Sequence, residues 1–303
     1  MRGPAYAGTR FKDHDVTIDL VLDAKAQLGE GPIWDAVRAR LLFVDIMRGE
    51  VHEFDPTTRT DRVIRVAEPV GAVVPSRRGD WIIATQTGFS RLDPASGAVH
   101  RIASVEADIP DTRMNDGAVD ARGRFWAGTM SMTGRRHGSL YRLDRDGRVS
   151  RMVTGVTVSN GIGWSPDGAH MYYVDTLTGR IDVFDFDEQW GTITNRRPFV
   201  TVSHRAGHPD GLVVDADGGV WLALWAGGAL QRYTPDGRLE QTIPLPVTHP
   251  TKCAFGGEDW TDLYITSAWI ELTAKEREAQ PLAGGVFVCR PGVAGQPARL
   301  FDG

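Results

Sequence analysis

A unit of 40 to 50 residues recurs six times along this chain, and it constrains the fold more than any other feature of the sequence. Each unit begins with a short apolar run, and glycine opens five of the six runs. The runs begin at Gly31, Gly71, Gly117, Gly161, Gly211 and Cys253, at offsets of 40, 46, 44, 50 and 42 residues. Such spacing is typical of the blades of a β-propeller.

Two more runs follow the first in each unit. The second is continuous and apolar, as at 41–44, and turn formers such as Ser165-Pro166-Asp167-Gly168 separate first from second runs. The third alternates apolar and polar residues, as at 50–55, which indicates a strand with one face in water. A weaker fourth strand follows several of them. Helical periodicity is almost absent, so the sequence predicts an all-β fold, a six-bladed β-propeller of four-stranded antiparallel blades.

A seventh strand-like segment, residues 16–22, precedes the first unit. We expect it to pair with the last blade and close the ring, because closure removes an open sheet edge. Residues 1–15 are expected to be a flexible leader and 16–303 a single propeller domain. The leader lacks the apolar core of a signal peptide, and no eighteen apolar residues run together. These observations predict a soluble, cytoplasmic protein with no membrane partner.

The charge and cysteine content exclude some classes of function. With 34 basic and 39 acidic residues, the net charge is −5 and both signs are interspersed, so nucleic acid is not an expected partner. Cys253 and Cys289 lack the spacing of metal ligands, and we expect both to be buried, reduced packing residues. The sequence leaves open whether the protein is a monomer or a homodimer.

The repeat brings oxygen-bearing side chains into one register. The first strand of a propeller blade lines the central channel, and all six first strands begin at the same end of it. The residues just before the six run starts are Glu30, Val70, Asp116, Asn160, Asp210 and Lys252. Each Asp-Gly or Asn-Gly pair alone could be an ordinary turn. Three carboxylates in one narrow channel, however, would repel each other by about 4 kcal/mol per pair at 4 Å.

A bound cation or raised pKa values must relieve that repulsion. All the candidate ligands are oxygens, which favours one divalent cation of the hard type, Ca²⁺, Mg²⁺ or Mn²⁺. Zn²⁺ remains possible in an open site. Two long connections, residues 129–137 and 267–284, are expected above the same mouth, the second with a short helix near 271–276. Trp225 and Trp269 lie where such loops could line the mouth.

Six motifs in order give the chain a specific resemblance. They are Leu28-Gly29-Glu30-Gly31-Pro32-Ile33-Trp34, Arg113-Met114-Asn115-Asp116-Gly117, Gly128-Thr129-Met130, Ser159-Asn160-Gly161, Pro209-Asp210-Gly211 and Pro281-Leu282-Ala283-Gly284-Gly285. Over residues 16–303 the chain resembles the family of senescence marker protein, gluconolactonase and luciferin-regenerating enzyme. The resemblance implies a propeller with one divalent cation in its channel that hydrolyses sugar lactones.

The resemblance also assigns roles to single residues. The family's metal ligands match Glu30, Asn160 and Asp210, and its substrate-contacting residues match Arg113 and Asn115. Asp116 shares the channel register without an assigned role, and we expect it to support a ligand or hold a water. Animal members place a glutamate a few residues after Gly-Thr-Met, whereas residues 131–133 contain no acid. This difference leaves the identity of the lactone open.

The expected reaction is metal-dependent hydrolysis of an aldonolactone to the aldonic acid, with Asp210 as metal ligand and general base. Arg113 and Asn115 would orient the sugar hydroxyls, although Arg113 could instead form a surface ion pair. Other interpretations remain: a phosphotriesterase-like, organophosphate-hydrolysing propeller, or a non-catalytic propeller that binds calcium or a partner protein. Ser165 lacks the second glycine of a nucleophile elbow, and His204 and His208 are expected to be solvated loop residues.

Overall fold

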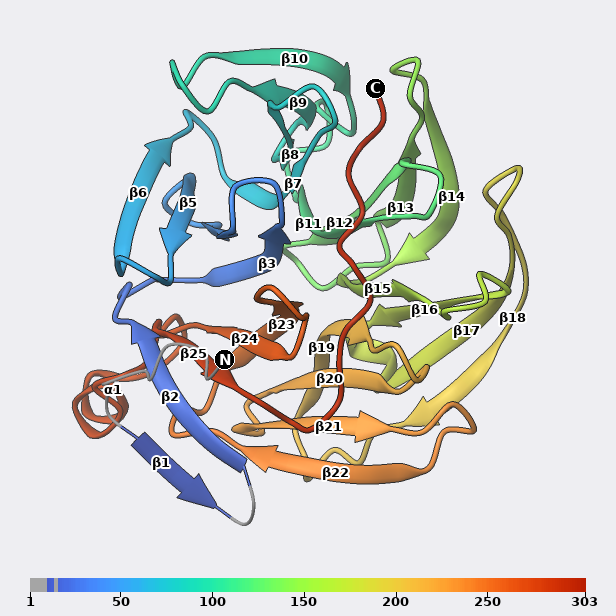
Figure 1. Ribbon diagram of the computed structural model, residues 1–303. Helices are drawn as coiled ribbons and strands as arrows, with labels where there is room; N and C mark the ends of the chain where they lie inside the picture. Colours follow the sequence, from blue (N-terminus) through green and yellow to red (C-terminus); the bar gives the residue numbers. More distant parts are fainter. Residues whose placement is uncertain (1–9, 14–15) are drawn as a thin grey trace.

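Six antiparallel sheets surround a central axis in the computed structural model, which describes residues 10–13 and 16–303 (Figure 1). In each sheet, strands adjacent in sequence pair with one another. The first three blades are β3 (Gly29–Asp35), β4 (Arg40–Asp45), β5 (Glu50–Asp55) and β6 (Thr60–Arg65); β7 (Val70–Pro75), β8 (Trp81–Thr85), β9 (Gly88–Leu92) and β10 (Val99–Ser104); and β11 (Thr112–Val119), β12 (Phe125–Ser131), β13 (Gly138–Leu143) and β14 (Val149–Val156).

The next two blades repeat this order, and the sixth is built from both ends of the chain. The fourth blade contains β15 (Ser159–Trp164), β16 (His170–Asp175), β17 (Arg180–Asp187) and β18 (Thr192–Thr201); the fifth contains β19 (His208–Val214), β20 (Val220–Trp225), β21 (Ala229–Tyr233) and β22 (Leu239–Pro244). The sixth contains β23 (Pro250–Gly256), β24 (Asp262–Ser267), β25 (Val286–Cys289), β2 (Val16–Leu22) and β1 (Arg10–Asp13). The predicted six-bladed β-propeller is therefore confirmed.

The N-terminal strand closes the ring as expected. β2 pairs antiparallel with β25, with Leu20 opposite Phe287, and thereby supplies the strand that the last unit lacks. β1 adds a fifth strand outside β2. The expected leader, residues 1–15, lies outside the described residues except for 10–13, which form β1. Only α1 (Ala274–Ala279) is α-helical among the described residues, and it lies in the long connection of the sixth blade, close to the helix expected there.

The core lies between neighbouring blades. The second strand of each blade is apolar and buried on both faces, as the continuous runs predict, and it includes the fully buried Trp81, Trp126 and Trp221. Cys253 and Cys289 are buried and unpaired in the core of the sixth blade, which confirms their expected packing role. No helix within the described residues is long and apolar enough to span a membrane.

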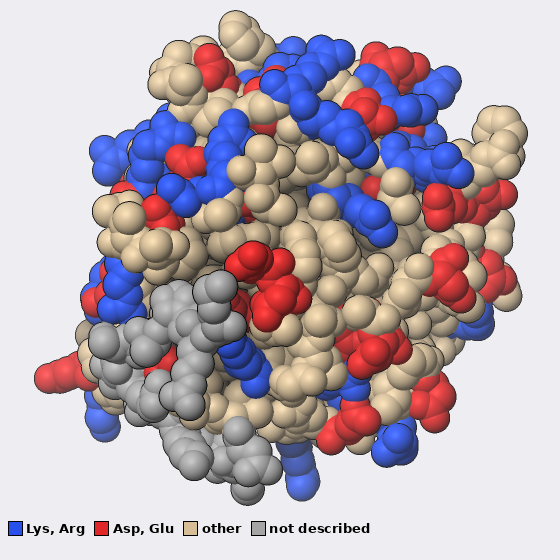
Figure 2. Space-filling view, in the orientation of Figure 1, with Lys and Arg blue, Asp and Glu red and all other residues tan. Residues whose placement is uncertain are grey.

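The C-terminal segment crosses one face of the ring, in front of the channel in Figure 1. We call residues 294–302 the strap. At its start Gly295 donates a backbone hydrogen bond to Trp260, and near its end Phe301 donates one to Pro75. Figure 2 shows the same face: it carries both blue and red side chains, and a red group lies near its centre beside uncharged surface. The inner strands end on this face, so the mouth formed by their starts lies on the opposite face.

Candidate active site

A β-bulge interrupts the innermost strand of every blade at the position where the register of polar residues lies. In β3 the regular pairing shifts between Glu30 and Ile33, in β15 between Ser159 and Ile162, and in β19 between Pro209 and Leu212. A bulge bends the strand and redirects its side chains, and bulges are common beside active sites. The register residues therefore lie inside the inner strands, and the alternative in which these dipeptides are ordinary turns is wrong.

The glycines after Asn160 and Asp210 let neighbouring inner strands approach one another closely. A Cβ atom on Gly161 would lie 2.7 Å from the backbone nitrogen of Leu212, in the next inner strand. On Gly211 it would lie 2.4 Å from the Cβ of Lys252. Neither contact is possible for a real side chain, so glycine is needed for packing around the axis. Turn formation does explain Asp146-Gly147 and Asp167-Gly168, whose glycines have positive φ values.

The polar residues of the register are buried together at the strand-start end of the channel. Glu30, Asp116, Asn160 and Asp210 are each 5% exposed or less. Arg113 and Asn115, which precede Asp116 in β11, are also buried. The alternative in which Arg113 forms a surface ion pair is therefore wrong.

The carboxylates interact strongly. Burial and the charge of Asp116 raise the pKa of Glu30 to about 8. Burial and the charges of Glu30 and Asp116 raise the pKa of Asp210 well above its ordinary value. Burial lowers the pKa of Arg113 to about 10, although the charges of Glu30 and Asp210 oppose that shift. These groups therefore share one weakly solvated environment, as the repeat predicts.

Asn160 is held by hydrogen bonds from both sides. Asn115 Nδ2 donates to Asn160 Oδ1 over 3.0 Å and to the carbonyl of Ser159 over 2.8 Å. Arg113 Nη1 in turn donates to Asn115 Oδ1 over 2.7 Å, and Asn160 Nδ2 donates to Thr176 Oγ1 over 2.8 Å. This network fixes the orientation of the Asn160 amide, because its nitrogen is held by Thr176 and its oxygen by Asn115. Arg113 and Asn115 thus support Asn160 in addition to any contact with substrate.

Asp116 forms an ion pair with Lys252, a residue to which no sequence motif assigns a role. Lys252 Nζ donates to Asp116 Oδ1 and, over 3.2 Å, to the carbonyl of Gly117. The Gly117 amide also donates to Asp116 Oδ1, whereas the buried Oδ2 has no hydrogen-bond partner in the described part of the chain. The sequence contained one signal for Lys252, because it occupies the sixth position of the same register. Its pairing with Asp116 could not be predicted, because the two residues approach each other only in the closed ring.

The residues present fit a hard divalent cation. With Asp116 engaged by Lys252, the carboxylates of Glu30 and Asp210 carry buried charge whose pKa values are raised, which is the condition that a cation relieves. The described residues contain no group of three or more His, Cys, Asp or Glu side chains able to hold a metal. The expected ligand set does not require such a group, because its third ligand is the amide oxygen of Asn160.

Residues near the mouth complete the candidate site. Asp111, just before β11, accepts a hydrogen bond through Oδ2 from Thr133 Oγ1 over 2.9 Å and lies 3.3 Å from His137 Nδ1, and both partners belong to the connection after β12. A carboxylate from the preceding connection therefore lies beside the loop in which residues 131–133 lack one. Trp225 stacks on His249 with ring centroids 4.1 Å apart, at the mouth end of the fifth and sixth blades. His249 is a buried histidine that sequence reasoning overlooked.

Other candidates lie away from the chemistry. His204 and His208 are exposed, as expected of solvated loop residues. Ser165 Oγ donates to Asp167 Oδ1 within the turn between β15 and β16, at the opposite end of the channel. Neither arrangement forms a nucleophile with a base beside it.

Comparisons with known proteins identify the family. The family model described as "SMP-30/Gluconolactonase/LRE-like region" matches residues 28–269. The chain belongs to this family. It is 38% identical to the regucalcin of Danio rerio over 95% of this chain and 99% of that protein. It is 36% identical to "Putative sugar lactone lactonase YvrE" of Bacillus subtilis, over 94% and 99%.

A solved structure agrees with the family assignment. A protein from Agrobacterium tumefaciens, described as a calcium-binding protein, regucalcin, superposes with a TM-score of 0.89 at 30% identity. The match covers 93% of this chain and 96% of that one. The resemblance to this family is therefore confirmed, and the matched residues include all five oxygen-bearing or basic positions of the register, from Glu30 to Lys252.

Proposed function

We propose that this protein hydrolyses the ester bond of a sugar lactone, an aldonolactone, and that the reaction depends on one divalent cation. The observation that carries the proposal is the buried set of Glu30, Asn160 and Asp210 beside Arg113 and Asn115 at one end of the channel. The sugar lactone lactonase name of the Bacillus subtilis relative supports the substrate class.

The residues proposed to hold the cation are Glu30, Asn160 and Asp210. Two carboxylates and one amide are an oxygen donor set suited to Ca²⁺, Mg²⁺ or Mn²⁺, with Zn²⁺ as a further candidate. When bound, the cation would polarise the lactone carbonyl and favour the negative charge that develops on its oxygen. Three protein ligands leave positions for water and substrate.

Asp210 is the proposed general base. Its carboxylate lies at the strand-start end of the channel, and its burial keeps solvent from competing for the proton that it accepts from the attacking water. Arg113 is a buried cation on which the charges of both Glu30 and Asp210 act, and it is suited to hold sugar hydroxyls or the carboxylate product by charge-assisted hydrogen bonds. Asn115 orients Asn160 and presents its own amide beside Arg113.

The proposal is tested with chelated protein restored with one metal at a time. A pH indicator would follow acid release from glucono-, galactono-, xylono- and arabinonolactones. We expect little turnover without metal and recovery with at least one of Ca²⁺, Mg²⁺, Mn²⁺ or Zn²⁺. No turnover of any lactone by protein shown to contain metal would contradict the proposal.

Calcium binding without catalysis is the second candidate, and the description of the Agrobacterium tumefaciens structure as a calcium-binding protein favours it. It predicts that calorimetry detects Ca²⁺ binding while every lactone stays intact. Paraoxon-type phosphotriesters in the same assay separate lactone hydrolysis from organophosphate hydrolysis, because both reactions could use the same cation.

A further inference from the structure

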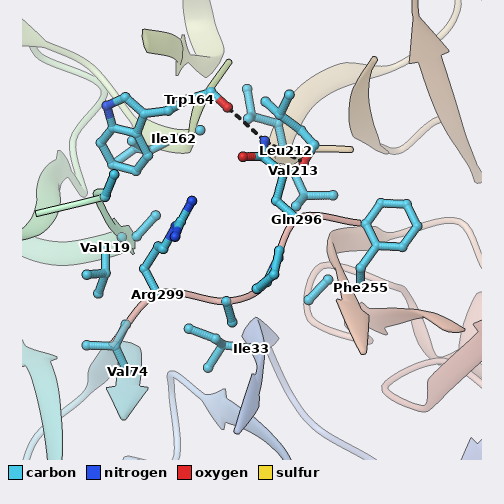
Figure 3. A pocket seen from close by; sticks show the side chains of 18 of the residues that line it. Ile33, Val74, Val119, Ile162, Trp164, Leu212, Val213, Phe255, Gln296 and Arg299 are labelled. Carbon is cyan, nitrogen blue, oxygen red and sulfur yellow. Dashed lines mark hydrogen bonds between the residues drawn. The ribbon is translucent and has the colours of Figure 1, made fainter. Parts of the chain in front are cut away.

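The central channel contains a second compartment on the face crossed by the strap. It is a cavity of about 190 Å³, which we call the lower cavity. Its wall is formed by apolar side chains near the ends of the inner strands, and the strap passes across it (Figure 3). The labelled apolar residues of the wall include Ile33, Val74, Val119, Ile162, Leu212 and Phe255.

The lower cavity ends where the candidate active site begins. Gly117 and Lys252 line its inner end, and they are the groups that hold Asp116. The ion pair between Lys252 and Asp116 therefore separates an acidic upper compartment from an apolar lower one. The lower cavity does not contain Glu30, Asn160 or Asp210 among its lining residues.

Several apolar side chains of the inner strands remain partly exposed because they face this cavity. In three inner strands a single residue is half-buried while its neighbours on both sides are buried. These residues are Ile33 in β3, Ala118 in β11 and Val213 in β19. Trp164 at the end of β15 is also half-buried. Apolar surface left open inside a channel is surface that an apolar ligand can cover.

One cation faces the lower cavity without a partner. Three charged side chains line the cavity: Glu188, Lys252 and Arg299. Glu188 is paired with Arg122 at 3.0 Å, and Lys252 is paired with Asp116. Arg299, in the strap, has no hydrogen bond or ion pair with any residue that the structure describes. Figure 3 shows its guanidinium projecting into the cavity beside Val119 and Trp164.

The strap holds Arg299 over the cavity by contacts on both sides. Before it, Gln296 Nε2 donates to the carbonyls of Trp164 and Val214 at 3.1 and 3.3 Å. After it, Phe301 is buried and its carbonyl accepts a hydrogen bond from the Arg77 amide. The backbone on either side of Arg299 is therefore fixed to the blades, while its long side chain can adjust to a ligand.

We propose that the lower cavity is a second small-molecule site, which takes a compact monocarboxylate with an aromatic or branched apolar body. The carboxylate would pair with the Arg299 guanidinium, whose planar fork matches its two oxygens. The body would lie against Ile33, Val213 and Phe255. The size is suitable, since an engineered apolar cavity of about 150 Å³ holds benzene. A sugar acid does not suit this wall, because its hydroxyls would find almost no polar partners there.

Calorimetric titration of the full-length protein tests the proposal, with benzoate and 3-phenylpropionate as probes. We expect one site per chain in the wild type. Arg299→Gln should weaken both carboxylates by roughly tenfold, because a charge-assisted hydrogen-bonded pair is lost, while Arg299→Lys should retain part of the affinity. Benzyl alcohol, which lacks the charge, should bind more weakly than benzoate and be unaffected by Arg299→Gln.

Filling the cavity gives an independent test. Ile33→Phe and Val213→Phe each add volume inside the lower cavity, and either variant that melts like the wild type should bind neither carboxylate. Asp210→Asn and metal chelation should leave carboxylate binding unchanged, because Asp210 lies in the other compartment. Failure of both probes to bind the wild type would overturn the proposal. Equal affinities in the wild type, Arg299→Gln and a folded filling variant would overturn it as well, as would loss of binding in Asp210→Asn.

Discussion

Lys252 shows how one residue can define the charge of a shared site. The charges of Asp116 and Glu30 act on neighbouring carboxylates of the channel, and the buried ammonium of Lys252 pairs with Asp116. Its charge also lowers the pKa of Glu30 and of Asp210, in opposition to the larger effect of burial. Because Lys252 pairs with Asp116, Glu30 and Asp210 are the two carboxylates left to bind a cation. This explains why Asp116 shares their register but is not a proposed metal ligand.

Replacing Lys252 should destabilise the fold. In Lys252→Met, Asp116 keeps its buried charge without a partner, and we expect a loss of about 3–5 kcal/mol in the free energy of unfolding. The double variant Lys252→Met/Asp116→Asn should recover much of that loss, because the uncompensated charge is removed. Urea unfolding measures both, and Lys25→Met, at an exposed ion pair, is the control with an expected change below about 1 kcal/mol. Equal stability of Lys252→Met and wild type would contradict the buried pair.

The raised pKa of Glu30 predicts how stability depends on pH in metal-free protein. Between its ordinary value near 4.5 and about 8, the folded protein binds a proton on Glu30 that the unfolded chain has released. The free energy of unfolding of chelated protein should therefore fall as the pH rises through this range, and Asp210 acts in the same direction. Denaturant titrations at several pH values measure the slope.

Glu30→Gln is the matched variant for this slope, since it removes the titrating proton and keeps the shape of the side chain. Its stability should vary less between pH 5 and 8 than that of the wild type. A cation that binds Glu30 and Asp210 competes with protons, so the stabilisation by added metal should increase with pH. The pKa assignment would be wrong if Glu30→Gln and wild type showed the same slope without metal.

At the scale of single elements, the sequence predicted more of the fold than of the site. The continuous second runs and alternating third runs placed the strands, because burial on two faces or on one leaves a direct mark on composition. The bulges in β3, β15 and β19 left no such mark, because an extra residue in a strand changes the pairing and not the apolar pattern. Sequence reasoning therefore identified the register residues but placed them just before the inner strands, and the structure places them within these strands.

The contacts across the channel were also beyond local patterns. The pair between Lys252 and Asp116 joins residues 136 positions apart in sequence, and it depends on the diameter of the closed ring. The link from Arg113 through Asn115 to Asn160 depends on how two inner strands lie side by side. The strap across the lower cavity had no signal, because residues 294–302 show neither strand nor helix periodicity.

β2 is the element whose loss is expected to matter most. It contributes the strand that covers β25, and its residues Ile18 and Val21 are buried. Deleting residues 1–25 would expose β25 as an open edge and uncover the core of the sixth blade, so the product should be insoluble or should lack a cooperative melting transition. Deleting residues 1–15 retains β2 and should leave melting cooperative. A soluble 26–303 chain with a wild-type transition would contradict ring closure by β2.

At the scale of the whole molecule, the propeller arranges two different environments along one axis. The starts of the inner strands contribute the buried charges of the upper compartment, and their ends contribute the apolar wall of the lower cavity. Both follow from the same repeat, because each inner strand passes through the channel in the same direction. We propose that chemistry takes place in the upper compartment and that the lower cavity binds a ligand.

The central claim is that Asp210 performs chemistry in the upper compartment. The most direct test is the rate of acid release from a responsive aldonolactone by metal-restored protein, compared between wild type and Asp210→Asn. Loss of a general base typically costs between about 10² and 10⁴ in rate, and loss of a metal ligand adds to it, so turnover should fall at least a hundredfold while the melting transition remains cooperative. A folded Asp210→Asn variant with near-wild-type turnover would contradict the account.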